Sequence, residues 1–196
     1  MLKRLRNYFI IKRIKHSFAK GSLTDPGTVF LPGAVCRNSG RPENLTIGPH
    51  CVIGGQFVCN CGGSIEVEGN AFIQTNTFLW AKERIVIKKN AIISNNVIIS
   101  DNNNHPTDPD MRLKMSECND YFNDELWSWK YSESAPITIG ENTWIGRDTR
   151  ILKGVTIGTG SIVAMGSVVT HDVPDYCIVA GNPAKVVKKL RSEEKE

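Results

Sequence analysis

The sequence has no long apolar run. Among its 196 residues, the longest apolar run near the N-terminus covers residues 8–11, and Lys12 and Arg13 follow it directly. A membrane-spanning helix needs about 20 apolar residues, and the apolar core of a signal peptide needs about 7–15. We therefore expect neither element, and we expect the protein to lie in the cytoplasm.

Extremes of composition are missing as well. Hydrophobic residues make up 40% and charged residues 22% of the chain, which is ordinary for a globular protein and argues against disorder. The 17 glycines and 9 prolines are too few for a collagen-like or low-complexity chain. The net charge of +4 is too mild to indicate a nucleic-acid partner unless it is clustered.

Motifs for phosphate and metal chemistry are also missing. The chain contains neither G-x-x-x-x-G-K-[ST] nor G-x-G-x-x-G, so neither a P-loop nor a dinucleotide-binding turn is expected. Cys59-Asn60-Cys61 has no second pair of cysteines or histidines at a matching spacing, so we expect no metal site. In a cytoplasmic protein the six cysteines are expected to be reduced thiols.

The sequence does have a six-residue repeat. Its period of six matches neither the 3.6 residues of a helix nor the two of a single strand. The repeat also runs through residues 47–99, where it slips twice by two residues, after positions 65 and 85. In its most regular part every sixth residue is a β-branched aliphatic: Ile139, Ile145, Ile151, Ile157, Val163 and Val169.

This period predicts short strands separated by turns, with one inward aliphatic side chain in each strand. Successive coils would stack about 4.8 Å apart and pair their backbones as a parallel β-helix. The two-residue slips indicate small insertions at corners. Gly140, Gly146 and Gly158 follow inward residues, and we expect them to take the unusual φ values that a corner needs.

Three strings in the last third of the chain are typical of one family. Residues 137–146 read Ile-Thr-Ile-Gly-Glu-Asn-Thr-Trp-Ile-Gly, residues 154–158 read Gly-Val-Thr-Ile-Gly, and residues 180–185 read Ala-Gly-Asn-Pro-Ala-Lys. They resemble the hexapeptide-repeat acyltransferases, above all the maltose and galactoside O-acetyltransferases and their polysaccharide-modifying relatives. The resemblance covers roughly residues 45–190. It implies a left-handed, all-β parallel β-helix, a homotrimer, and acetyl-CoA as co-substrate.

The expected organisation has three parts. Residues 1–20 form a basic amphipathic helix, and residues 21–190 form the β-helix, with a loop insertion at 101–136 and a short C-terminal helix. Residues 191–196 form a charged tail. We expect the first helix to cap the open end of the β-helix. The alternative is a weak peripheral contact with anionic lipid at the inner face of the membrane.

His105 is the candidate general base. A histidine suits this role because it titrates near working pH. His105 stands where the repeat stops, and with Pro106 it matches the catalytic His-Pro of the family; the alternative is a polar histidine in a turn. The resemblance also places Trp144 beside the active site, whereas Gln74 and Asn76 are weaker candidates for contacts with the acceptor.

The resemblance further implies a coenzyme A site on the last coils. Ala164, Met165 and Gly166 would line the pantetheine groove, and Thr170 and His171 follow them. Gly146 is a further cofactor-binding candidate. Lys185 and Lys188 would reach the 3′-phosphate as point charges. The alternative for these two lysines is a solvated C-terminal helix.

The insertion is rich in aromatic residues, with acidic residues between them. Disordered loops are poor in aromatics, so these rings are expected to pack on a neighbouring subunit or to stack on a sugar ring. We expect Trp127 and Trp129 to shape an acceptor site for a large glycan. The aromatic residues are Tyr121, Phe122, Trp127, Trp129 and Tyr131.

Together these features predict an acetyl-CoA-dependent O-acetyltransferase. It would acetylate a sugar hydroxyl, of a surface polysaccharide or its precursor, with backbone N–H groups as oxyanion donors. The resemblance implies that the active site lies between subunits. One alternative is an N-acetyltransferase acting on an amino sugar or an antibiotic. Another is a trimeric glycan-binding scaffold without catalysis.

Overall fold

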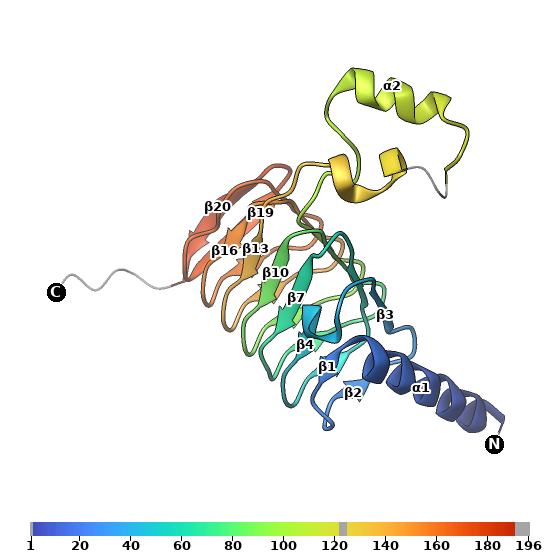
Figure 1. Cartoon of the computed structure of the whole chain (residues 1–196). Helices are drawn as coiled ribbons and strands as arrows, with labels where there is room; N and C mark the ends of the chain where they lie inside the picture. Colours follow the sequence, from blue (N-terminus) through green and yellow to red (C-terminus); the bar gives the residue numbers. More distant parts are fainter. Residues whose placement is uncertain (1, 122–124, 191–196) are drawn as a thin grey trace.

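The chain winds into a triangular coil with three parallel sheets as its faces (Figure 1). The computed structural model describes residues 2–121 and 125–190. The first sheet contains β1 (Leu23–Thr24), β4 (Leu45–Ile47), β7 (Ser64–Val67), β10 (Arg84–Ile87), β13 (Ile137–Ile139) and β16 (Thr156–Ile157). The third contains β3 (Val35–Asn38), β6 (Gln56–Cys59), β9 (Phe78–Ala81), β12 (Ile98–Ser100), β15 (Arg150–Ile151) and β18 (Val168–Val169).

The second sheet lies between these two along each coil. Its strands are β2 (Val29–Phe30), β5 (Val52–Ile53), β8 (Phe72–Ile73), β11 (Ile92–Ile93), β14 (Trp144–Ile145), β17 (Ile162–Val163), β19 (Cys177–Gly181) and β20 (Ala184–Lys189). A short 3-10 turn, η1 (Pro42–Asn44), precedes β4. The expected left-handed parallel β-helix is confirmed.

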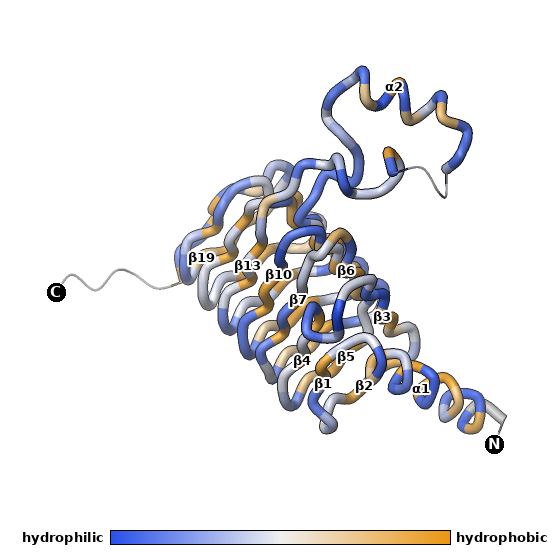
Figure 2. The backbone as a smooth tube through the Cα atoms, viewed as in Figure 1, coloured by the Kyte–Doolittle hydropathy of each residue, from blue (hydrophilic) through white to orange (hydrophobic). Residues whose placement is uncertain are grey.

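The side chains that recur every six residues form the core of this coil. Ile93, Ile145 and Val163 pair in register across β11, β14 and β17, and all three are fully buried. Figure 2 shows hydrophobic residues recurring along the strands of successive coils. Each inward position therefore rests on the same position of the next coil, which is why the period has to stay strict.

The two slips of the period lie at one corner, between the third and the first sheet. There β6, β7, β9 and β10 are each four residues long, whereas β15, in a later coil, has only two residues. The expected corner insertions are thus present. The long insertion after β12 leaves the β-helix at this same corner.

The expectation for the corner glycines is wrong. Gly146 does not have a positive φ; instead, a Cβ atom there would lie 2.6 Å from the backbone nitrogen of Met165. Gly140 and Gly158 are constrained in the same way by the coil beside them. These glycines allow two backbones to approach. The left-handed corner positions are held mostly by residues that tolerate this conformation, namely Asn70, Asn90, Asn142, Asn76, Asn96 and Asp148.

Helix α1 (Leu2–Gly21) covers the first coil with its second half. Phe18 is buried, with its ring centroid 4.6 Å from that of Phe30 and 5.9 Å from that of Phe57. The first half projects from the β-helix and leaves Leu5 and Phe9 exposed. Neither helix in the described part of the chain is long and apolar enough to cross a bilayer. The lipid contact considered for residues 1–20 stays a prediction.

The chain returns at its C-terminal end as a strand. The expected short C-terminal helix is wrong, because β20 runs antiparallel to β19. The β-branched pair Val186-Val187 favours an extended backbone, and β20 occupies the backbone edge that β19 would otherwise expose. The tail at 191–196 lies outside the described residues.

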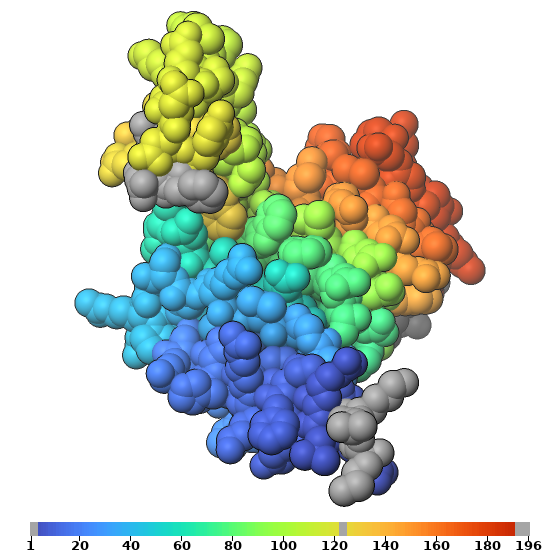
Figure 3. All heavy atoms as spheres, turned by 90° about the vertical axis from the view of Figure 1, so that its right-hand side faces the viewer, coloured from blue at the N-terminus to red at the C-terminus, as the bar shows by residue number. Residues whose placement is uncertain are grey.

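The insertion stands apart from the coils (Figure 1). Its two ends form an antiparallel neck, in which the backbone N–H of Ala135 donates to Asp101 O at 2.9 Å and that of Asn103 donates to Glu133 O at 3.0 Å. Beyond the neck lie α2 (Pro109–Glu117), η2 (Glu125–Trp127) and η3 (Trp129–Tyr131). Figure 3 shows a concave surface between this insertion and the last coils. Phe122 lies outside the described residues.

Candidate functional site

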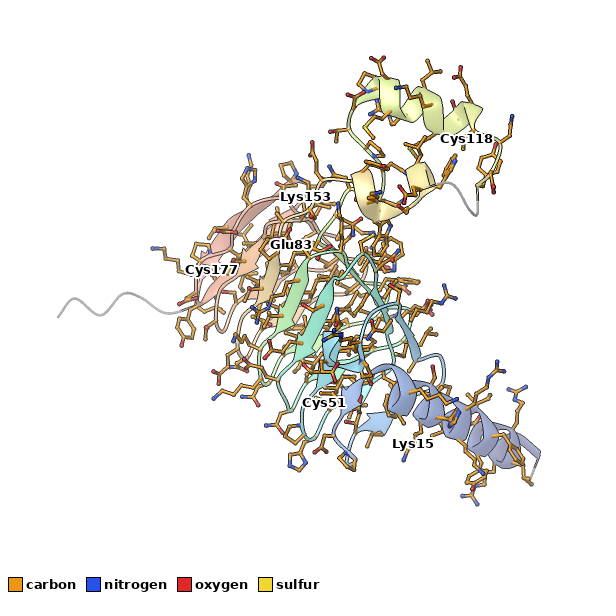
Figure 4. All side chains as sticks on the ribbon, in the orientation of Figure 1. Lys15, Cys51, Glu83, Cys118, Lys153 and Cys177 are labelled. Atoms are coloured by element: carbon orange, nitrogen blue, oxygen red, sulfur yellow. The ribbon has the colours of Figure 1, made fainter. Side chains whose placement is uncertain are left out.

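The neck of the insertion is anchored by one buried carboxylate. Asp101 is fully buried, and its two oxygens accept the backbone N–H groups of Lys82 at 2.8 Å and Glu83 at 2.7 Å. The Lys82 ammonium in turn donates to the backbone carbonyls of Ser132 and Lys130. Glu83 and Lys153 lie at this corner, below the insertion (Figure 4). The start and the end of the insertion are therefore tied to the preceding coil.

His105 lies just beyond this neck and is half-buried. Its Nε2 is 2.9 Å from Asn104 Nδ2, and its ring centroid is 5.8 Å from that of Trp127, edge to face. Its Nδ1 is buried and has no hydrogen-bond partner among the described residues. Pro106, which follows, is buried and holds the backbone beside the ring. A histidine on a rigid anchor is suited to proton transfer.

The tryptophans of the insertion lie around this histidine. Trp127 Nε1 donates to Met115 O at 3.0 Å and contacts Cys118 Sγ at 3.1 Å, and its ring also packs against Tyr121. Trp129 Nε1 donates to Asn104 Oδ1 at 2.7 Å. The structure therefore brings the predicted residues His105, Trp127 and Trp129 into one cluster. Both tryptophans are half-buried.

An open cavity of about 450 Å³ lies at another corner, between the second and the third sheet. Trp144 is half exposed there, and its indole Nε1 lies 3.4 Å from Ser94 Oγ. Apolar walls with a few polar groups are suited to an extended, mostly apolar ligand. The lining residues are Gln74, Ser94, Asn95, Trp144, Gly146, Arg147, Ile162, Val163, Ala164 and Met165.

Five predicted residues line this cavity: Gln74, Trp144, Gly146, Ala164 and Met165. His105 does not line it, because the cavity precedes the strands of the third sheet along each coil and the insertion follows them. A single chain therefore holds the His105 cluster and the cavity at different corners.

The other predicted residues lie outside the cavity lining. Asn76 and Gly166 have φ values of 58° and 72° and occupy left-handed corner positions. Thr170 Oγ1 lies 2.8 Å from His171 Nδ1, so these two side chains bond to each other. Trp127 and Trp129 belong to the insertion, and Lys185 and Lys188 lie on β20.

Five other lining residues are not predicted as site residues from the sequence, namely Ser94, Asn95, Arg147, Ile162 and Val163. Ile162 pairs with Trp144 eighteen residues earlier, so the period itself could have indicated it. The period does not indicate Ser94, because its coil neighbour lies beyond the insertion: the backbone N–H of Ser94 donates to Ile145 O. Counting in steps of six cannot relate residues on the two sides of the insertion.

The pKa values of three groups near the insertion and its corner are shifted. The hydrogen bond from Lys130 lowers the pKa of the exposed Glu125 carboxyl, and the same contact raises the pKa of Lys130. Burial raises the pKa of the Cys59 thiol to about 12, so this thiol is protonated near neutral pH. Among the described residues, no three His, Cys, Asp or Glu side chains are grouped to hold a metal ion.

Comparison with family models gives one match. The model of the bacterial transferase hexapeptide (six repeats) matches residues 136–171, which is the segment that contains β13 to β18. This match supports the resemblance read from the sequence strings. It includes Trp144, Gly146, Ala164 and Met165 of the cavity.

Curated relatives match over part of their length. "Putative acetyltransferase SAR2635" of Staphylococcus aureus is 49% identical over 63 residues, which are 32% of this chain and 32% of the relative. "Putative acetyltransferase YJL218W" of Saccharomyces cerevisiae is 38% identical over 90 residues, or 46% of this chain and 38% of the relative. The match thus spans about a third of the length of these relatives.

Solved structures share the fold over nearly the whole chain. The polySia-specific acetyltransferase NeuO aligns with a TM-score of 0.63 at 23% identity, covering 90% of this chain and 88% of its own. AntD, an N-acyltransferase from Bacillus cereus solved with dTDP and coenzyme A, aligns with a TM-score of 0.69 at 19% identity, covering 90% of both chains. At these identities the likeness shows the fold alone.

Proposed function

We propose that this hexapeptide-repeat β-helix protein is an acetyl-CoA-dependent O-acetyltransferase that acts on a sugar hydroxyl. The observation that carries the proposal is the cavity of about 450 Å³, one wall of which comes from the matched segment at 136–171. The relatives named as acetyltransferases and the coenzyme A bound to AntD support an acyl-CoA co-substrate.

His105 supplies the base in this proposal. Its Nε2 takes the proton of the acceptor hydroxyl while the hydroxyl oxygen attacks the thioester carbonyl carbon. The carbon–sulfur bond then breaks, and the departing thiolate takes the proton from His105. The products are an acetyl ester and free coenzyme A. Backbone N–H groups stabilise the oxyanion that forms at the carbonyl oxygen.

The cavity binds the donor. Trp144 and Met165 offer exposed apolar surface to the pantetheine arm, while Ala164 and Gly146 keep the groove open. Lys185 and Lys188 lie on β20, and their positive charges attract the 3′-phosphate of the coenzyme. This strand pairs with β19, which pairs in turn with the cavity strand β17, so the cations lie on the same sheet as the groove.

A homotrimer completes the site, because one chain keeps His105 and the cavity at different corners. The outward face of the second sheet supports such an assembly, since it carries apolar side chains in register from coil to coil. An apolar stripe of this kind is typical of a contact between subunits. Its members are Val29, Val52, Phe72, Ile92, Trp144 and Ile162.

The insertion forms the acceptor side. Trp129 and Trp80 have ring centroids 6.5 Å apart, and Phe78 lies 5.6 Å from Trp80, so aromatic rings gather beside the His105 cluster. Aromatic faces suit the apolar face of a sugar ring. These rings support a polysaccharide or its precursor as the acceptor.

Release of free thiol from acetyl-CoA tests this function, with polysaccharide and simple-sugar acceptors compared. We expect acceptor-dependent release by the wild type and a loss of about 10²–10⁴ in kcat for His105→Ala. Activity of His105→Ala within a factor of two of the wild type would rule out His105 as the base. Release with amino sugars only would favour N-acetylation.

A further inference from the structure

Three side chains of the insertion form a directed chain of hydrogen bonds that ends on His105. Trp129 Nε1 donates to Asn104 Oδ1 at 2.7 Å, and Asn104 Nδ2 lies 2.9 Å from His105 Nε2. The indole N–H is only a donor, so the Asn104 atom that faces Trp129 has to be the amide oxygen. The amide nitrogen therefore faces His105.

The direction of this chain decides which nitrogen of His105 carries the proton. An amide NH₂ group only donates, so Nε2 has to accept and keeps its lone pair. In the neutral ring the proton then lies on Nδ1. Nδ1 has no hydrogen-bond partner among the described residues, so no contact on that side opposes this arrangement.

The backbone places Asn104 for this task. Asn104 has a φ of 66°, a left-handed conformation that asparagine and aspartate tolerate and most other residues avoid. Its own backbone N–H donates to Asn102 Oδ1 at 2.8 Å, and Asn102 is buried in the anchored neck. The amide is thus held by the neck below it and by Trp129 beside it.

We infer that Asn104 and Trp129 are positioning residues that select the Nδ1–H tautomer of His105 and so present Nε2 as the base. This inference rests on the proposed function, in which Nε2 accepts the hydroxyl proton. Before the acceptor binds, the Asn104 amide occupies the Nε2 lone pair; the acceptor hydroxyl then takes that place. The insertion therefore orients the base as well as forming an acceptor surface.

The imidazole ¹⁵N shifts of His105 test the inference directly, because the two neutral tautomers give distinct patterns. The measurement uses the full-length ¹⁵N-labelled protein above the titration range of its histidines, and His105→Gln assigns the signal by its absence. We expect the Nδ1–H pattern in the wild type. Trp129→Phe, which removes only the donor and keeps a ring, is expected to give a mixture of both tautomers.

Asn104→Asp replaces the hydrogen-bond donor that faces His105 with an acceptor, without changing the size or the backbone preference of the residue. A carboxylate accepts from Trp129 Nε1 and also from His105, so the ring is expected to switch to the Nε2–H tautomer. We expect kcat to fall by about 10- to 100-fold, with KM for acetyl-CoA changed by less than about twofold because the donor cavity is elsewhere. Trp80→Phe is the matched control for the ¹⁵N pattern, which it is expected to leave unchanged, because Trp80 touches the Trp129 ring but does not bond to Asn104.

The outcomes separate the two proposals. An Nε2–H wild type, or an Asn104→Asp variant that keeps the wild-type tautomer, overturns the inference. If Trp129→Phe fails to fold, Asn104→Asp still decides the question. Absence of thiol release by a wild type with the Nδ1–H pattern contradicts the proposed function instead, because the tautomer is measured without any substrate.

Discussion

At the scale of single residues, the corners of the coil use asparagine and glycine for different reasons. Asn90 and Asn142 stand in left-handed positions one coil apart, where their short polar side chains are tolerated. Gly48 has an ordinary φ, but a Cβ atom there would lie 1.7 Å from the carbonyl oxygen of Glu68. The sequence marks both residue types as turn formers and does not tell the two causes apart.

Cys59 gives a residue-scale prediction about pH. It occupies an inward position that the period usually gives to Ile or Val, and burial raises the pKa of its thiol to about 12. The folded protein therefore holds this proton more tightly than the unfolded chain. The resulting stability is fully present below the ordinary thiol pKa of about 8.5 and is lost as pH rises from there towards 12.

Thermal unfolding between pH 8 and pH 11 measures this effect. We expect Tm of the wild type to fall across that range, and to fall less steeply in Cys59→Val, which fills the same inward position without a titratable group. If Tm fell equally steeply with pH in the two proteins, ionisation of Cys59 would not contribute to the loss of stability.

At the scale of elements, the neck decides where the candidate base lies. Asp101 joins the neck to the corner before β10 through two backbone N–H groups. The six-residue period predicts the strands and the position of the insertion, because each inward aliphatic has to stack on its neighbour. It does not predict the arrangement inside the insertion, where contacts such as Trp129 to Asn104 join residues that no repeat relates. The C-terminal strand escaped prediction because its lysines are equally compatible with a solvated helix.

Asp101→Asn tests the neck. The amide keeps the shape but replaces one acceptor oxygen with a donor, so we expect a loss of about 1.5–3 kcal/mol in the free energy of unfolding, as for a hydrogen bond to a charged group. Acetyl transfer should fall as well, because His105 loses its fixed anchor.

Asp108→Asn provides the matched control in denaturant unfolding. Asp108 is the N-cap of α2 and accepts from Asp110 N and Met111 N. Asparagine caps helices about as well as aspartate, so a change of only a few tenths of a kcal/mol is expected. Equal losses in the two variants would contradict the special role of the Asp101 carboxylate.

At the scale of the whole molecule, the proposed reaction requires more than one chain, because His105 and the donor cavity lie at different corners of one chain. A strand period of six fixes the residues of each half, but it does not say which corner of one subunit faces which corner of the next. That relation depends on how the outer faces of the coils pack. The repeat is defined by side chains that face inward, so it does not predict this packing.

Mixed assemblies test the shared site. His105→Ala and Ala164→Trp should each be inactive alone, the first for lack of a base and the second because the indole fills the cavity. Refolded together in equal amounts, they should recover about a quarter of wild-type sites if the base and the cavity come from different subunits. No recovery in assemblies shown by light scattering to be mixed would place both halves of the site in one chain.

Binding of acetyl-CoA tests the central claim most directly, by titration calorimetry on the wild type with Ala164→Trp as the control. The account predicts saturable binding to the wild type, binding of similar strength to His105→Ala, and none to Ala164→Trp, because the cavity and not the base holds the donor. Absence of wild-type binding up to millimolar acetyl-CoA would contradict the assignment as an acetyltransferase.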